Sequence, residues 1–440
     1  MQTIRNISVE DYNYLLPDER VAKFPLPERD SSKLLVFKDN QITESIFRAL
    51  PDIVPEGSLM VFNNTKVIQA RLVFHKKTGG RIEIFCLEPV EPADYAQAFA
   101  QTEAVTWLCM VGNLKKWKEP KVEKEFLVND TKIILSAEII ENKGLTHHIR
   151  FSWYCHCGRD PQSPEKREQG VAGHTSTSLC NQARNDRMVT FSEILETIGE
   201  LPIPPYLHRA ATERDKETYQ TVYSKIKGSV AAPTAGLHFT ETVFNSLKSK
   251  SIQTAELTLH VGAGTFHPVK SAQIAEHEMH TEIFSISKSL IEKLLKKPVI
   301  AVGTTTVRTL ESLYYLGVQI GTDCKSAPAA LMGVTQWQPY EREYTLSTEK
   351  SLQNILDYMQ KNGLETLTSH TQIMIVPSFP FRVVQSIVTN FHQPKSTLLL
   401  LVSAFAGKHW RDIYDYALAN DFRFLSYGDS SILLKEKADC

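Results

Sequence analysis

Short apolar runs followed by small and hydroxyl-bearing residues recur along the chain and predict an α/β fold. Pro298–Val302 is a continuous apolar run, as in a strand buried within a parallel sheet. It leads into Gly303–Glu311, where glycine and threonines precede a helical pattern. Ser386–Thr397 repeats the order of strand, polar loop and helix start. Ligands of open α/β sheets lie at the carboxyl ends of strands, so these loops are the first candidates for a site.

The stretch Gly228–His267 has the same organisation and the densest set of candidate groups. Its pattern predicts strand, loop, helix, strand and loop. The first loop, Ala231–Phe239, contains His238, and the second, His260–His267, is rich in glycine. Glycines at a strand end let the backbone approach a ligand closely. We therefore predict that this stretch contributes to the site.

Other periodic segments complete the predicted fold. Asp215–Tyr223 has helical spacing, and its tyrosines either pack onto the core or form a ligand wall made by Tyr219, Gln220 and Tyr223. Helices are predicted at Phe191–Ile198, Lys288–Lys297 and near Glu349–Lys361, and strands at Leu34–Phe37, Ser58–Phe62, Ile373–Val376 and Phe422–Asp429.

Residues 67–154 have a different pattern, with short strands of alternating polarity. This predicts a small antiparallel β-barrel domain inserted into an α/β domain formed by residues 1–66 and 190–440. Within the insert, Lys115, Lys116 and Lys118 surround Trp117. Basic residues beside an aromatic ring suit RNA contact, whereas lysines in an edge loop also prevent aggregation. Both interpretations remain open.

Residues 155–189 are polar and without periodicity, which predicts a surface insertion. Cys155, Cys157 and Cys180 lie in it and could ligate zinc, but C-x-C is not the usual C-x-x-C spacing. Glu276–Glu282 is dense in titratable groups, yet its alternation fits the start of a strand. We predict no metal site.

Length, composition and charge limit which classes of protein are compatible with the chain. The chain has 440 residues, 42% of them apolar, and suggests about two or three domains. A net charge of −1 argues against a general polyanion binder, although a local basic patch remains compatible with specific RNA contact. We predict a cytoplasmic protein without signal peptide or membrane span, whose seven cysteines are reduced.

Histidine, threonine, arginine, asparagine, lysine and aspartate thus gather at several predicted strand ends. This distribution is typical of an enzyme. It favours a transferase or lyase acting on a nucleoside-like ligand, and by itself it does not name the substrate.

Ordered motifs narrow the interpretation. They are RDSSKLLVF, FNNTKVIQARL, LPIPPYL, GSVAAPTAGLHFT, LTLHVGAGTFHPV, EHEMHTE, AVGTTTVRTLES, TNFHQPKSTLLLLVSAFAG and FRFLSYGD. Together they resemble the S-adenosylmethionine:tRNA ribosyltransferase-isomerase family of queuosine biosynthesis over most of the chain. Residues 155–189 and 313–370 are longer than the family pattern, and Ser378 stands where glycine is expected. These departures bear only on local surface, RNA contacts and oligomer contacts.

The resemblance implies a layered α/β domain with an inserted small β-barrel. It implies transfer and isomerisation of the ribosyl part of S-adenosylmethionine onto 7-aminomethyl-7-deazaguanine at the tRNA wobble position. Epoxyqueuosine, adenine and methionine are the implied products. No cofactor is expected beyond S-adenosylmethionine as co-substrate. The expected partners are this co-substrate and the tRNA, with a monomer favoured.

The reaction requires a base near the sulfonium and a proton donor near adenine. We predict His238 or His260 as the base, with His392 and Asp429 as acid or orienting groups. Thr304, Thr305 and Arg308 are predicted to hold ribose or carboxylate, and Asn390 and Lys395 the second substrate; further predicted substrate contacts are Thr234, Gly236, Gly262, Gly264, Thr265, Ser396 and Tyr219.

Two rival functions make different predictions. A non-catalytic RNA-binding module would bind tRNA through the lysines of the insert without releasing adenine. A methyltransferase would produce S-adenosylhomocysteine, but the chain lacks an early strand–GxGxG–helix unit.

Overall fold

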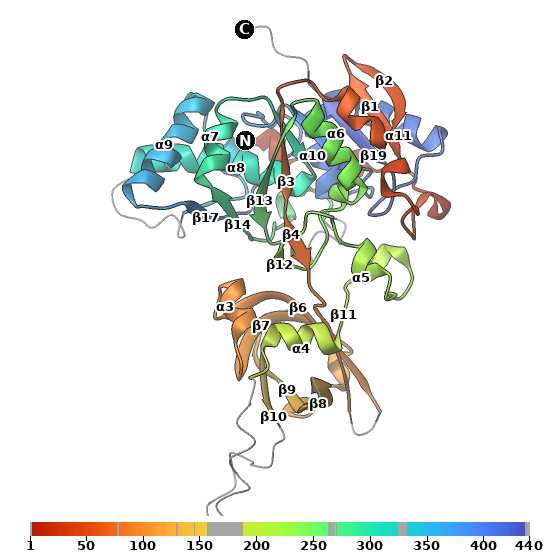
Figure 1. Cartoon of the computed structure of the whole chain (residues 1–440), viewed down its shortest axis with the longest axis vertical. Coiled ribbons are helices and arrows are strands. Elements are labelled where there is room, and N and C mark those ends of the chain that lie inside the picture. Colours follow the sequence, from red (N-terminus) through yellow and green to blue (C-terminus); the bar gives the residue numbers. More distant parts are fainter. Residues whose placement is uncertain are drawn as a thin grey trace, which may run out of the picture. The chain divides into compact units, whose positions relative to one another are not determined.

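The computed structural model describes residues 2–76, 79–128, 131–144, 146–155, 188–262, 269, 271–323 and 332–435. The chain forms two compact units, residues 1–67 with 203–440 and residues 68–202. The larger unit contains a mixed sheet with helices, and the smaller one a curled antiparallel sheet (Figure 1). The predicted fold class, an α/β domain with an inserted small antiparallel domain, is confirmed.

A mixed sheet, ten-stranded within the described residues, forms the centre of the larger unit. The strands β3, β13, β15 and β18 run parallel to their neighbours at its centre, and β19 is antiparallel to β18. In spatial order the strands are β16 (Gly333–Val334), β17 (Thr366–Thr371), β14 (Glu282–Ser287), β13 (Gln253–Leu259), β3 (Leu59–Asn63), β15 (Val299–Val302), β18 (Ser386–Asn390), β19 (Ser430–Leu434), β1 (Lys33–Lys38) and β2 (Gln41–Ile46).

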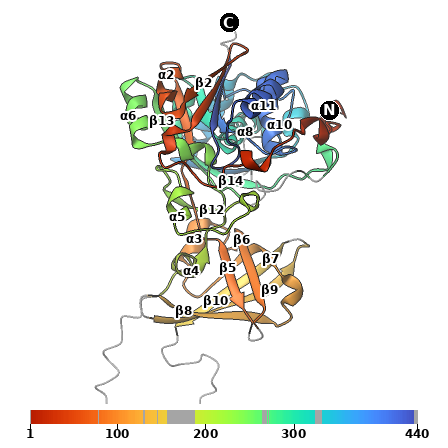
Figure 2. The ribbon, with the colours of Figure 1, turned by 90° about the vertical axis from the view of Figure 1, so that its right-hand side faces the viewer.

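Helices cover both faces of this sheet because its central strands are apolar on both sides. Met60 and Phe62 on β3 belong to one apolar cluster with α2 (Leu50–Ile53) and α6 (Glu241–Ser249). Figure 2 shows α8 (Thr304–Asp323) and α10 (Thr397–Ala406) on the opposite side of the sheet from these two helices. The larger unit also contains α1 (Gln2–Arg5), α5 (Asp215–Thr218), α7 (Lys288–Leu294), α9 (Thr348–Lys361), α11 (Trp410–Ala419) and the parallel strands β4 (Thr65–Val67) and β12 (Ile226–Ser229).

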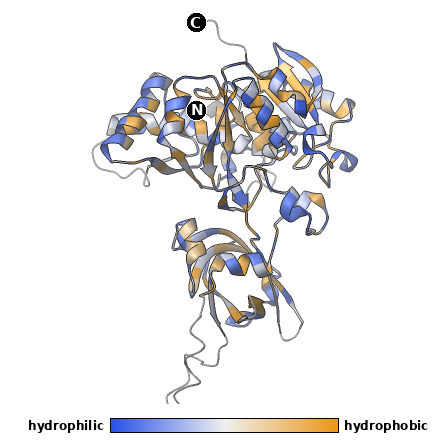
Figure 3. Ribbon diagram, in the orientation of Figure 1, coloured by the Kyte–Doolittle hydropathy of each residue, from blue (hydrophilic) through white to orange (hydrophobic). Residues whose placement is uncertain are grey.

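The smaller unit is a curled antiparallel sheet closed over an aromatic core. The sheet curls so that its strands Lys121–Val128 and Arg71–His75 approach each other, since Lys124 Nζ donates to Val73 O at 3.0 Å. Figure 3 shows both apolar and polar residues along these strands, and the buried ones include the alternating Ile82, Ile84 and Cys86. In spatial order the strands are β11 (Gly199–Glu200), β5 (Arg71–His75), β6 (Arg81–Glu91), β7 (Ala104–Gly112), β10 (His147–Cys155), β9 (Thr131–Asn142) and β8 (Lys121–Val128); its helices are α3 (Tyr95–Ala100) and α4 (Phe191–Ile198).

The helix α4 confirms the predicted element at Phe191–Ile198, but it lies in the smaller unit. Phe191 packs against Trp107 and Trp153, with both pairs of ring centroids 5.7 Å apart. Strand β11 pairs with β5. The chain therefore returns to the α/β unit after Pro202, later than the boundary at 190 drawn from the sequence pattern.

Two predicted strands are wrong. The run Ile373–Val376 is buried but irregular, because Met374 N donates to a loop carbonyl and Val376 N donates to the Tyr340 hydroxyl. Phe422–Asp429 contains a tight turn rather than a strand. Leu425 has φ of 70°, and the chain enters β19 only at Ser430. In both segments burial explains the apolar pattern without regular pairing.

Helix α5 is also shorter than the spacing of Asp215–Tyr223 predicts. It ends at Thr218, and the two tyrosines that follow are buried in irregular structure. Packing, rather than helical register, accounts for their pattern.

Candidate functional site

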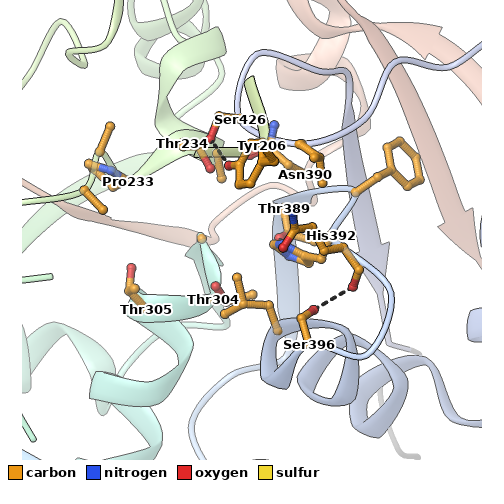
Figure 4. A pocket seen from close by; sticks show the side chains of 18 of the residues that line it. Tyr206, Pro233, Thr234, Thr304, Thr305, Thr389, Asn390, His392, Ser396 and Ser426 are labelled. Atoms are coloured by element: carbon orange, nitrogen blue, oxygen red, sulfur yellow. Dashed lines mark hydrogen bonds between the residues drawn. The ribbon is translucent and has the colours of Figure 1, made fainter. Parts of the chain in front are cut away.

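A cavity opens where the parallel strands β15 and β18 end, at the carboxyl edge of the sheet. Segments distant in sequence converge on it (Figure 4). This is the position at which open α/β sheets bind ligands. The lining residues are Tyr206, Tyr219, Ala231, Ala232, Pro233, Thr234, Ala235, Gly303, Thr304, Thr305, Thr389, Asn390, Phe391, His392, Gln393, Ser396, Leu398, Leu425 and Ser426.

The amino end of α8 forms one wall. Gly303 precedes it with φ of 91°, a conformation that favours glycine, and its N–H donates to Val388 O at 2.8 Å. Thr304 and Thr305 follow in the first turn and line the cavity with little exposure. Unpaired N–H groups at this helix end give the wall a partial positive charge. The wall therefore suits a hydroxyl-rich or anionic ligand group.

His392 is the imidazole that lines the cavity. Its Nε2 lies 2.9 Å from Thr389 Oγ1, and among the described residues its Nδ1 has no protein partner, which leaves that nitrogen for a ligand. The backbone on both sides is fixed, because the His392 N–H donates to Tyr414 OH and the Tyr14 hydroxyl donates to His392 O. Burial lowers the pKa of His392 to about 3. The ring is therefore neutral at physiological pH.

Asn390 is held from behind by His238, whose other ring nitrogen contacts Ser32. Its Nδ2 lies 3.1 Å from His238 Nε2 and 3.5 Å from Asp429 O. A carbonyl oxygen can only accept, so the amide nitrogen must face this side. His238 Nε2 then accepts as well, and its Nδ1–H donates to Ser32 Oγ at 2.9 Å. Asn390 Oδ1 is buried and has no partner among the described residues, which leaves it for a hydrogen-bond donor in the cavity.

His238 and Asp429 thus lie behind the cavity wall rather than in it. The Asp429 carboxylate accepts hydrogen bonds from Lys33 N, Arg423 N and Arg423 Nη2. Of the two roles predicted for Asp429, acid or orienting group, this geometry favours the orienting one. The structure brings Thr234, Thr304, Thr305, Asn390, His392, Ser396 and Tyr219 together in the cavity lining.

Other predicted site residues lie outside that lining. Gly236 packs so tightly that an added Cβ would lie 1.8 Å from Tyr223 OH, which explains the glycine by packing. Arg308 is buried in an ion pair with Glu282. Lys395 Nζ pairs with Glu10 at 2.6 Å. The described lining also omits His260 and Gly262, while Gly264 and Thr265 lie outside the described residues.

The sequence patterns did not single out several residues that line the cavity. The Tyr206 hydroxyl lies 2.6 Å from Ser426 Oγ, which joins two loops across the wall. Leu425 is held at its positive φ by its N–H bond to Phe391 O, at 3.0 Å. Tyr206 and Ser426 lie in the motifs LPIPPYL and FRFLSYGD, so the resemblance of those motifs to the family could have identified them as site residues.

The predicted RNA loop lies in the smaller unit. Lys115, Lys116 and Lys118 are exposed, but the Trp117 ring between them is buried. The lysines can contact a polyanion, whereas the ring cannot serve as a stacking platform in this conformation.

The described residues contain neither a metal-binding cluster nor a membrane-spanning helix. They contain no group of three or more His, Cys, Asp or Glu side chains placed to hold a metal ion. Cys157 and Cys180 lie outside that range. No described helix is both long and apolar enough to span a bilayer.

The buried histidines predict acid sensitivity. Burial lowers the pKa of His238 from 6.5 to about 4, so between these values the unfolded chain binds more protons than the folded one. The neutral form of His238 therefore contributes to the free energy of unfolding at pH 7.5, and this contribution is lost as the pH falls. For His238 the loss by pH 4.5 is roughly 2–3 kcal/mol.

Urea unfolding of wild type and His238→Gln at both pH values measures this loss. The variant should lose roughly 2–3 kcal/mol less than wild type on acidification. Glu311, whose pKa burial raises to about 7, acts in the opposite direction but is present in both proteins and cancels in the comparison. If both proteins lose the same free energy of unfolding on acidification, the lowered pKa of His238 is not the cause of the acid sensitivity.

Fold and cavity together define a ligand-binding α/β protein with a neutral histidine and hydroxyl groups at the carboxyl edge of its sheet. Residues 9–433 match the family described as queuosine biosynthesis protein. The chain is similar to the S-adenosylmethionine:tRNA ribosyltransferase-isomerase of Aromatoleum aromaticum, at 34% identity over 97% of this chain and 98% of that protein. It is 35% identical to the protein of the same name from Psychrobacter arcticus, over 98% of this chain and 93% of that protein.

A solved structure of the S-adenosylmethionine tRNA ribosyltransferase from Thermotoga maritima is 26% identical, with a TM-score of 0.42 over 96% of this chain and 100% of that one. From the family match and the two relatives, the chain belongs to the S-adenosylmethionine:tRNA ribosyltransferase-isomerase family of queuosine biosynthesis proteins. It is accordingly an enzyme of the transferase and isomerase class, and the motif resemblance is confirmed.

Proposed function

We propose that the enzyme transfers and isomerises the ribosyl moiety of S-adenosylmethionine onto the aminomethyl group of 7-aminomethyl-7-deazaguanine in tRNA. Similarity over nearly the full length to two relatives named S-adenosylmethionine:tRNA ribosyltransferase-isomerase carries the proposal. The cavity supports it, because the family-like motifs supply most of its lining. The product at the wobble position would be epoxyqueuosine, with adenine and methionine released.

This reaction makes a bond from a ribosyl carbon to the aminomethyl nitrogen and a carbon–carbon bond within the ribosyl group. It breaks two bonds of the co-substrate to its leaving groups, an N–H bond of the amine and the C–H bond next to sulfur. The glycosidic bond breaks as adenine leaves with a proton, and the carbon–sulfur bond breaks as methionine leaves. The sulfonium acidifies the adjacent carbon, so a neutral imidazole is a reasonable base. No further cofactor is proposed, because S-adenosylmethionine supplies both the ribosyl group and the leaving groups.

We assign the direct proton-transfer role to His392. It lines the cavity, it is neutral, and Thr389 fixes its ring while leaving Nδ1 for a ligand. His238 is one of the two predicted bases, but both of its ring nitrogens form hydrogen bonds, one with Ser32 and one with Asn390. We therefore propose that His238 positions Asn390. His260, at the end of β13, remains the other predicted base.

The remaining lining suits the two substrates. Thr304 and Thr305 at the helix start would hold the ribose hydroxyls. Tyr206 and Tyr219 present aromatic rings, which attract a sulfonium cation. Asn390 Oδ1 would accept from an N–H or O–H group of a bound substrate. The deazaguanine would have to be turned out of the anticodon stack to reach these groups.

The RNA partner is proposed to contact Lys115, Lys116 and Lys118 as well as the cavity. We place the reaction in the cytoplasm, with the enzyme acting as a monomer.

Product analysis by mass spectrometry tests this function. Purified protein is incubated with S-adenosylmethionine and tRNA carrying the aminomethyl base. Adenine and methionine in equal amounts are expected. S-adenosylhomocysteine would identify a methyltransferase, and tRNA binding without any small-molecule product would identify an RNA-binding module; either result refutes the proposal.

A further inference from the structure

A second cavity lies behind the wall formed by His238 and Asn390. Its polar lining consists of Arg29, Ser32, Thr218, His238, Arg423, Ser426 and Tyr427. Ser426 lines both this cavity and the one that contains His392. The two cavities therefore share a wall, and a group bound in one lies close to a ligand bound in the other.

Arg29 is a half-buried cation without an acidic partner in the described structure. Its Nη1 donates to Gln220 O at 2.6 Å and its Nη2 donates to Glu217 O at 2.9 Å. Both acceptors are neutral carbonyls, and they use two of the five N–H donors of the guanidinium. Burial lowers the pKa of Arg29, and no carboxylate offsets this effect. The remaining donors have no acceptor, and the charge no acidic partner, among the described residues.

The surrounding charges do not compensate Arg29. Arg423 is neutralised by Asp429, with Nη2 3.0 Å from Oδ1. The nearest acidic residues in sequence are engaged elsewhere, because Asp30 and Glu28 both pair with Arg48. His238 is neutral, since burial lowers its pKa to about 4. The cavity therefore carries one uncompensated positive charge, and a buried charge of this kind favours an anionic ligand.

We propose that this second cavity is an oxyanion site, centred on Arg29, that binds a backbone phosphodiester of the RNA substrate. A guanidinium presents paired donors that match the oxygens of a phosphate or carboxylate. Because the two cavities share a wall, the phosphates of a nucleotide whose base enters the first cavity would lie near the second. This favours the phosphodiester over the carboxylate of S-adenosylmethionine. The inference rests on the proposed function, because it takes the RNA of that reaction as its ligand.

The salt dependence of RNA binding tests the site. Each phosphate contact contributes about 0.7–0.9 to the slope of log K against log salt. We expect Arg29→Gln to reduce that slope by about 0.7–0.9 and to weaken binding of the substrate tRNA about tenfold at low salt. Affinity for S-adenosylmethionine, measured by calorimetry, should stay within about twofold of wild type. Arg29→Lys, which keeps the charge, should retain most of the slope.

Lys250→Gln is the control, because it removes one positive charge that is already paired with Asp52 on the surface of the larger unit. It should leave the slope unchanged. Thermal unfolding of all variants, with adenine release at saturating tRNA, verifies that Arg29→Gln is folded. An unchanged slope in a folded Arg29→Gln protein overturns the site, even where wild type releases adenine. Loss of affinity for S-adenosylmethionine with an unchanged slope overturns the phosphodiester assignment in favour of the carboxylate.

Discussion

Replacing His392 by alanine is expected to lower kcat about 10²–10⁴-fold, the range typical of a lost general acid–base residue. The reason is its placement. It is the imidazole in the described cavity lining, it is neutral because burial lowers its pKa to about 3, and Thr389 orients its ring. Binding of S-adenosylmethionine should change little, because proton transfer contributes to the transition state rather than to the ground state. Single-turnover adenine release and calorimetric binding measure the two effects separately.

His75→Ala is a suitable control, since that histidine is exposed at the end of β5. It should retain wild-type turnover. A folded His392→Ala protein with turnover within about tenfold of wild type would contradict the assignment, and a large loss in His260→Ala under the same conditions would transfer the role to that residue.

Asn390→Asp is expected to lower kcat/KM about 10²-fold at pH 8. The substitution keeps Oδ1 but places an oxygen where Nδ2 faced His238 Nε2 and Asp429 O, so two acceptors lose their donor. Unsatisfied buried groups of this kind cost roughly 1–3 kcal/mol each, which corresponds to the expected loss. The new carboxylate would also favour protonation of His238. Activity should therefore recover partly as the pH is lowered to 6.

The pH profile separates this explanation from simple misfolding, which would not be repaired by acid. Asn362→Asp, at the exposed end of α9, is the matched control and should follow the wild-type profile. Equal fractional losses of Asn390→Asp at pH 8 and pH 6 would rule out the coupling between Asn390 and His238.

Much of the larger unit could be predicted because its elements are locally specified. The run Pro298–Val302 is long enough and apolar enough to define β15, and the glycine and threonines after it define the start of α8. Similar reasoning found β18 and the loop with Asn390 and His392. The carboxyl-edge rule then placed these loops at one cavity without any knowledge of the tertiary contacts.

Residues whose roles depend on distant packing could not be predicted. Gly236 lies in a suggestive loop, yet its small size is required by Tyr223. Arg308 follows the threonines at the start of α8, yet its side chain forms an ion pair with Glu282 on strand β14. Conversely, Tyr206 lies in a proline-rich segment and reaches the cavity only because the chain brings it to Ser426. Such partners are separated by many residues, and periodicity contains no information about them.

Isotope labelling of the ribosyl carbons tests most directly whether the ribosyl group of S-adenosylmethionine is transferred to tRNA. The enzyme is supplied with S-adenosylmethionine carrying ¹³C throughout the ribosyl group and with tRNA carrying the aminomethyl base, and the tRNA is then digested to nucleosides. Ribosyl transfer that depends on His392 predicts a modified 7-deazaguanosine that contains every labelled carbon, formed by wild type and nearly absent with His392→Ala. Modified tRNA without the label, or labelled tRNA formed equally well by His392→Ala, would contradict it.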